Sequence, residues 1–168
     1  MTRTKCMWLV VGVALVLLAA SLPGWGAQDQ KTLTINATVA AKATLTLGVA
    51  AINFPDADPD SVPSIDANEN PVDVSVKAHT GSASPVSLSV QANGDLQSGG
   101  DTIAITNVSW TATGAGYVPG AMDTVAVPAG SWTGSGKYDG TFSYVLANSW
   151  DYAVGNYTQT VVYTLTAP

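Results

Sequence analysis

The sequence predicts an all-β protein, an antiparallel β-sandwich of about eight or nine strands. Apolar and polar residues alternate along most of the chain, which is the two-residue period of strands with one buried face. Clusters of Gly, Asn, Asp and Pro that favour turns separate these runs. No stretch has a convincing helical period. A series of short strands joined by tight turns is typical of two packed antiparallel sheets.

The chain is expected to begin with a signal peptide over residues 1–26. Arg3 and Lys5 provide a short basic start, residues 7–20 are an apolar run, and Pro23 ends it before a series of small residues. We expect cleavage before Ala27, with cleavage after Ser21 as a second possible position, and an N-terminal membrane anchor is the alternative to a signal peptide. The sequence therefore predicts export to the periplasm, the cell surface or the extracellular space, with no stable membrane insertion after cleavage.

Residues 27–168 are expected to form a single domain of strongly acidic character. They contain four Lys, no Arg, one His and all 12 acidic residues, for a net charge of −8, and the only cysteine, Cys6, lies in the segment that is removed. A domain of this size buries enough surface to fold without a disulfide or a metal. The acidity disfavours nucleic acids and anionic membranes as partners.

The alternating runs place the expected strands in order along the chain. They cover residues 33–39, 43–49, 72–78, 86–92, 103–112 with a bend at Asn107, 124–127, 142–146 and 157–165. Asn93 and Gly94 follow one of these runs directly, and this dipeptide is the strongest short signal of a hairpin turn. The longest irregular segment, residues 55–71, is rich in Asp and Pro and is expected to be an extended loop.

The acidic loop offers a possible calcium site, the only cofactor that the sequence suggests. Asp56, Asp58 and Asp60 have the one-three-five spacing of carboxylates that wrap around a hard cation. However, Ser61 stands at position six and Ala67 at position twelve, where the calcium loop has Gly and Glu. A solvated acidic loop is therefore favoured over a calcium site.

Catalysis is not expected. The sole histidine, His79, follows a predicted strand with no recognisable motif for nucleophilic chemistry around it. Two suitably spaced carboxylates are enough for glycoside hydrolysis, but most acidic residues lie in turns, where Asp is expected for local hydrogen bonding. The sequence favours a protein that is not an enzyme.

Aromatic residues concentrate in the C-terminal half and raise the alternative of a secreted carbohydrate-binding module. Trp110 and Tyr144 alternate with apolar neighbours and are expected in the core. Trp132 and Trp150 stand beside Gly or Ser, so they are the candidates for an exposed platform on which a sugar ring stacks.

The two ends of the predicted mature chain are both alternating runs. At the start, one face carries Leu33, Ile35, Ala37 and Val39, and at the end one face carries Tyr157, Gln159, Val161, Tyr163 and Leu165. Strands at the extremes of a chain suit strand exchange, in which one subunit completes the sheet of another. The alternative is that both strands pair within their own domain.

Residues 35–39 (INATV) and 155–165 (GNYTQTVVYTL), in an exported Thr- and Ala-rich chain, resemble bacterial fimbrial subunits and the spore coat protein U group. The resemblance implies an incomplete immunoglobulin-like (pilin-like) sandwich that a donor strand completes and a periplasmic chaperone helps to fold. It further implies that Leu33, Ile35, Ala37 and Val39 are donor-strand residues and that 157–165 is the strand that the chaperone recognises. The expected function is that of a structural subunit that associates with itself or with related surface subunits.

Overall fold

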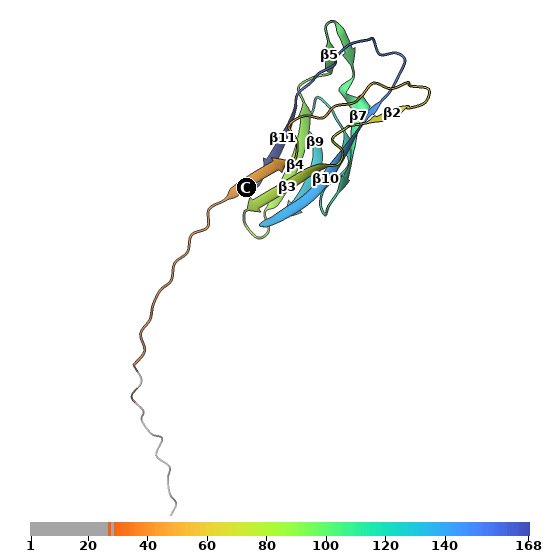
Figure 1. Cartoon of the computed structure of the whole chain (residues 1–168). Coiled ribbons are helices and arrows are strands. Elements are labelled where there is room, and N and C mark those ends of the chain that lie inside the picture. Colours follow the sequence, from red (N-terminus) through yellow and green to blue (C-terminus); the bar gives the residue numbers. More distant parts are fainter. Residues whose placement is uncertain (1–26, 28) are drawn as a thin grey trace, which may run out of the picture. The chain divides into compact units, whose positions relative to one another are not determined.

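The structure is a computed structural model that describes residues 27 and 29–168 (Figure 1). The expected signal peptide over residues 1–26 lies outside these described residues. Contacts divide the chain after Asn36 into two units. The described residues of the first unit, 27 and 29–36, are exposed and contain neither helix nor strand. In the part of the chain that is described, no helix is long and apolar enough to cross a membrane.

The second unit, Ala37–Pro168, contains two main antiparallel sheets. The larger sheet has the order β1 (Lys42–Leu47), β3 (Val72–His79), β10 (Gly136–Ala147), β7 (Val108–Thr113) and β8 (Gly120–Ala121), and β2 (Ser64–Asp66) pairs with the last residues of β10. The smaller sheet has the order β11 (Val161–Thr166), β4 (Pro85–Ala92) and β9 (Val127–Thr133). A separate hairpin joins β5 (Leu96–Ser98) to β6 (Asp101–Ile103), and a short 3-10 helix covers Ile105–Asn107.

The core lies between the two main sheets because their strands alternate in burial. In β3 and β4 every second side chain is buried and is Val, Leu or Ala, while the intervening residues are mostly exposed and polar. Phe142 of β10 is fully buried at the centre and contacts the rings of Trp110, Tyr117, Tyr144 and Tyr163. Burial of each large apolar side chain contributes about 1.5–3 kcal/mol, so this layer is the main source of stability.

The predicted all-β, antiparallel architecture is confirmed, with differences in detail. The described residues form 11 strands instead of eight or nine, because four strands of two or three residues are too short to show an alternating pattern. The 3-10 helix occupies the predicted bend at Asn107. The expected strand 124–127 is wrong, since β9 begins only at Val127.

Two predicted strands at the ends of the chain also need correction. Residues 33–39 do not form a strand, because no neighbouring strand pairs with their backbone in this structure. The last strand begins at Val161, so Tyr157 and Gln159 of the predicted C-terminal face precede β11. Thr158, which lies between them, forms an isolated bridge with Gln97 of β5.

Candidate assembly surface

One side of the sandwich is bordered by β1 and β11, and we call it the open side. β1 is the outermost strand of the larger sheet and β11 is the outermost strand of the smaller sheet. The two strands touch each other, but neither is hydrogen-bonded to a second strand within the described chain. Each therefore presents a free backbone edge, which is the feature that allows another strand to be added.

The inward-facing side chains of the open side are only partly covered. Leu45 and Leu47 of β1 lie opposite Val76 and Val74 of β3 and share their face of the sheet. The two valines are fully buried, whereas both leucines are half-buried. The pattern repeats in the smaller sheet, where the predicted C-terminal residues Val161, Tyr163 and Leu165 are half-buried opposite the buried Ala92, Val90 and Leu88.

Tyr163 of the smaller sheet contacts two residues of the larger sheet on the open side. Its hydroxyl lies 2.6 Å from the hydroxyl of Tyr144, and its ring stacks on Phe142 with the centroids 6.2 Å apart. Burial raises the pKa of Tyr163 well above its usual range and also raises the pKa of Tyr144. Both hydroxyls therefore remain neutral at physiological pH. They hydrogen-bond to each other, while the two rings pack against Phe142 in the core.

The opposite side, which we call the closed side, is joined by backbone hydrogen bonds between residues 114–118 and β9. Tyr117 bridges Gly130, the Val118 amide donates to the Ala129 carbonyl at 3.1 Å, and the Ser131 amide donates to the Gly116 carbonyl at 2.9 Å. Gly116 has a φ of 86°, and a side chain at this position would overlap the Trp132 indole. The glycine therefore allows the loop to lie directly against that ring.

Trp132 belongs to the core of the closed side and is not an exposed platform. It is 8% exposed, and its indole stacks on Tyr138 and meets Tyr117 edge to face. Its Nε1 donates to the Ala115 carbonyl at 2.7 Å. This burial contradicts its predicted role in sugar binding. The neighbouring Gly and Ser residues suggested exposure, but the small residues make room for the indole.

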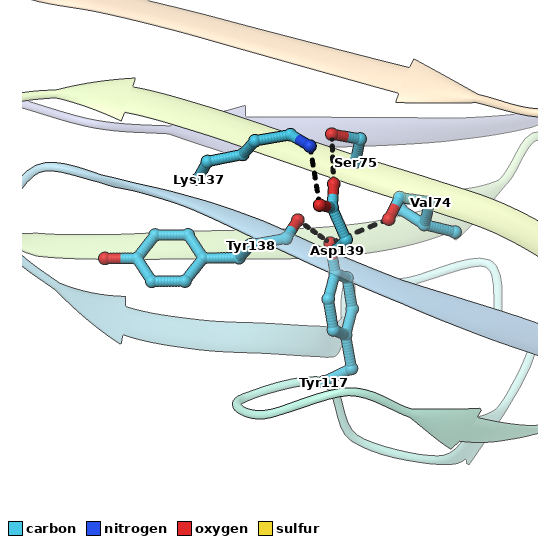
Figure 2. A network of polar contacts seen from close by, with 6 residues as sticks. All are labelled: Val74, Ser75, Tyr117, Lys137, Tyr138 and Asp139. Carbon is cyan, nitrogen blue, oxygen red and sulfur yellow. Dashed lines mark hydrogen bonds and ion pairs between the residues drawn. The ribbon is translucent and has the colours of Figure 1, made fainter.

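Tyr117 extends from the closed side to the backbone of the larger sheet (Figure 2). Its hydroxyl donates to the Tyr138 carbonyl at 2.7 Å and lies 3.2 Å from the Val74 carbonyl. Burial, with a smaller contribution from the charge of Asp139, raises the pKa of Tyr117 to about 12. Asp139 itself accepts hydrogen bonds from Lys137 and Ser75 on the exposed face of the sheet, and these partners lower the pKa of its carboxyl.

The predicted N-terminal assembly residues lie on an exposed segment. Leu33, Ile35 and Val39 are 83%, 84% and 77% exposed, and Ala37 is also exposed. Isolated apolar side chains on a surface are common, but four that alternate with Thr and Asn along one segment are the pattern of a half-buried strand. This segment has the residue pattern of a strand but lacks a partner strand in the structure.

The acidic loop does not gather its carboxylates around one point. Asp58 Oδ1 accepts a hydrogen bond from the Asp60 amide at 2.9 Å, and Asp60 Oδ1 accepts one from Trp150 Nε1 at 3.0 Å. Across the described ranges, no three His, Cys, Asp or Glu side chains come together as metal ligands. Asp58 and Asp60 instead make these local hydrogen bonds, and a calcium site at Asp56, Asp58 and Asp60 stays a prediction.

The second predicted sugar platform, Trp150, has a different environment from Trp132. Its side chain is 69% exposed and lies beside the acidic loop, where its indole nitrogen is held by Asp60. Tyr152, two residues later, is half-buried and donates to the Ala147 carbonyl at 3.0 Å. Trp150 thus has the exposure that stacking on a ligand requires.

Comparisons with known proteins do not assign the chain to a family. No protein-family model matches the chain, and no curated protein matches it at a significant level.

Proposed function

We propose that this protein is a non-enzymatic structural subunit of an extracellular or cell-surface assembly. In this assembly, residues 33–39 of one copy are added as a strand on the open side of another copy. One observation carries the proposal. The inward-facing apolar residues of β1 and β11 are half-buried, while the residues directly opposite them in β3 and β4 are fully buried. An additional strand would cover the half-buried side chains of β1 and β11.

The dimensions and chemistry of the N-terminal segment fit this role. A seven-residue strand is about 23 Å long at 3.3 Å per residue, which is close to the length of the six-residue strands β1 and β11. Its backbone would pair with a free edge, and its alternate side chains would enter the open side. Each buried large aliphatic side chain, such as Leu33 or Ile35, would contribute about 1.5–3 kcal/mol.

The wider setting of the proposal is that of the fimbrial and spore coat U groups. The domain would be an incomplete immunoglobulin-like sandwich, exported by means of residues 1–26. A periplasmic chaperone would protect β11 until another subunit takes its place. The partners would be further copies of this chain or related surface subunits. The partly covered faces of β1 and β11 support this proposal, because an exposed apolar edge requires protection before assembly.

The test is the oligomeric state of the protein that begins at Ala27. Light scattering after size-exclusion chromatography should show a ladder of multimers. Ile35→Asp should abolish the ladder, because an unpaired carboxylate in an apolar groove costs more than the lost burial. Thr34→Asp is the matched control, since it adds the same charge to the opposite face of the segment. Multimers that persist in Ile35→Asp, or a wild-type protein that is monomeric, would contradict the proposal.

The second candidate function is carbohydrate binding through Trp150, which its 69% exposure and its contact with Asp60 favour. An exposed indole face next to a carboxylate combines a stacking surface with a hydrogen-bond acceptor for sugar hydroxyls. Titration with polysaccharides should then change the intrinsic fluorescence of the wild-type protein and leave that of Trp150→Ala unchanged. A response that is identical in both proteins would exclude Trp150 as the platform.

A further inference from the structure

Positive charge collects at one end of the second unit, which we call the basal end. A shallow pocket of about 650 Å³ is lined there by Lys42 of β1, Lys77 and His79 of β3, and Lys137 of β10. These three lysines are all but one of the lysines in residues 27–168. Lys77 lies directly opposite Lys137 in the strand register, and Lys42 lies directly opposite His79.

This arrangement leaves positive charge uncompensated. Like charges directly opposite each other on neighbouring strands destabilise a sheet. Of these three lysines, only Lys137 has an ion-pair partner among the described residues, the Asp139 carboxylate at 2.7 Å, whereas Lys42 and Lys77 have none. In a domain with three times as many acidic as basic residues, two unpaired lysines beside a third favour the binding of a negatively charged group from another molecule.

Negative charge collects at the opposite end, which we call the distal end. The acidic loop is fixed there by Asn148, whose side-chain amide donates to the carbonyls of Ala57 and Val62. Gly136 starts β10 in the basal pocket and Ala147 ends it beside β2, so the 12 residues of β10 separate the two ends by roughly 35 Å. Figure 1 shows β2 and β5 at the end of the domain away from the C-terminus.

Nine of the 12 acidic residues lie in loops and short strands at this distal end. They are Asp56, Asp58, Asp60, Asp66, Glu69, Asp95, Asp101, Asp123 and Asp151. The domain is therefore electrically polar along its strands, with a basic basal end and an acidic distal end.

We propose that the basal lysines of one copy dock on the acidic loop of the next copy, so that successive copies stack head to tail. The occupant of the lysine pocket is then a second copy of this chain, and the argument for it is charge complementarity. This proposal rests on the proposed function, because strand addition between copies is what brings the two ends together.

The direction of the added strand agrees with this stacking. Lys42 follows Val39 by three residues, so the donating segment enters its own domain at the basal end. β11 runs from the distal end, where Val161 lies opposite Ala92, to the basal end, where Thr166 lies opposite Ser87. A strand added antiparallel to β11, like every paired strand in the described sheets, therefore ends at the acceptor's distal end.

This orientation brings the donor's lysines to the acceptor's acidic loop. A strand added in the opposite direction would instead place the lysines of both copies together, and repulsion would disfavour it. The contact is heterologous, because each copy uses two different surfaces, and repetition of it gives an open polar filament. The charges therefore select one direction of insertion among the two that a free edge allows.

The experiment uses two charge-reversed variants of the protein that begins at Ala27. One carries Lys42→Glu and Lys77→Glu, and the other carries Asp56→Lys and Asp60→Lys. Each alone should assemble about tenfold more slowly than wild type at about 50 mM salt, because steering charges act mainly on the association rate. An equimolar mixture should recover the wild-type rate, since alternating copies restore complementary ends. At about 500 mM salt the differences should disappear, because exposed charges are then screened.

The possible results separate this proposal from strand addition itself. Wild-type rates in both variants, or a mixture that is no faster than its components, would overturn the head-to-tail contact. If Ile35→Asp still abolishes assembly in that case, strand addition stands without it. If the wild-type protein does not associate, both proposals fail. Normal assembly by the lysine variant together with loss of its retention on immobilised heparin would assign the basal pocket to an acidic polysaccharide and would also overturn the contact.

Discussion

The open and closed sides of the sandwich have similar apolar residues on their inner faces, but different segments border them. On the closed side, residues 114–118 lie along β9, and Tyr117 and Trp132 fill the space between the sheets. On the open side, β1 and β11 have Leu, Val and Tyr on their inner faces, but no further strand pairs with their outer edges in the described residues. Apolar content is therefore not what distinguishes the two sides. The difference is that a segment of the same domain, residues 114–118, joins the two sheets on the closed side, whereas no such segment pairs with β1 or β11 on the open side.

The largest expected effect is on the closed side. Trp132→Ala removes a buried indole that contacts two tyrosine rings, and such a truncation costs about 3–5 kcal/mol in the free energy of unfolding. Trp150→Ala removes the same side chain from an exposed position and should change stability by less than about 0.5 kcal/mol. Urea unfolding followed by circular dichroism measures both. Equal losses in the two variants would mean that Trp132 is not a core residue.

A paired comparison within one strand register measures the open side directly. Leu88 is 1% exposed and lies opposite Leu165, which is half-buried. In the monomer, Leu88→Ala should cost about 2–5 kcal/mol and Leu165→Ala less than half as much, because less contact is lost. The same urea titration gives both values. A Leu165→Ala variant as unstable as Leu88→Ala would show that β11 is already covered.

A smaller effect is expected from the hydroxyl of Tyr117. Tyr117→Phe removes one buried hydrogen bond and should cost about 1 kcal/mol near pH 7. Because the pKa of Tyr117 is about 12 in the folded protein and near 10 when unfolded, the unfolded state releases its proton first as the pH rises. The contribution of Tyr117 to wild-type stability should therefore be constant below about pH 9 and should fall between about pH 10 and 12.

The variant provides the control for this pH dependence. Tyr117→Phe should show a shallower decline in the same range, and some decline should remain because Tyr144 and Tyr163 also have raised pKa values. Chemical denaturation at a series of alkaline pH values measures the two slopes. Identical slopes for the wild type and the variant would mean that Tyr117 ionises as easily in the folded state as in the unfolded state.

The sequence predicts the strands that are long and alternate regularly, such as β3, β4 and the second half of β10, because burial of one face is a local property of the pattern. The burial of Trp132 could not be predicted, because its indole fits against both Gly130, which is near in the sequence, and Gly116, which is distant in the sequence. Residues 33–39 have the pattern of a strand, but strand formation also requires a partner edge, which no local pattern supplies. The basic basal end could not be predicted either, because only the strand register places Lys42, Lys77 and Lys137 on neighbouring strands at one end of the sheet.

The most direct test of strand addition on the open side mixes two variants of the full mature chain. Ile35→Asp removes the ability to donate a strand, and Leu165→Asp removes the ability to accept one. Circular dichroism first establishes that each variant is folded, and light scattering then gives the masses. We expect each variant alone to be monomeric and the mixture to contain complexes of one copy of each. Multimers of either variant alone, or a mixture that remains monomeric while the wild type assembles, would contradict strand addition on the open side.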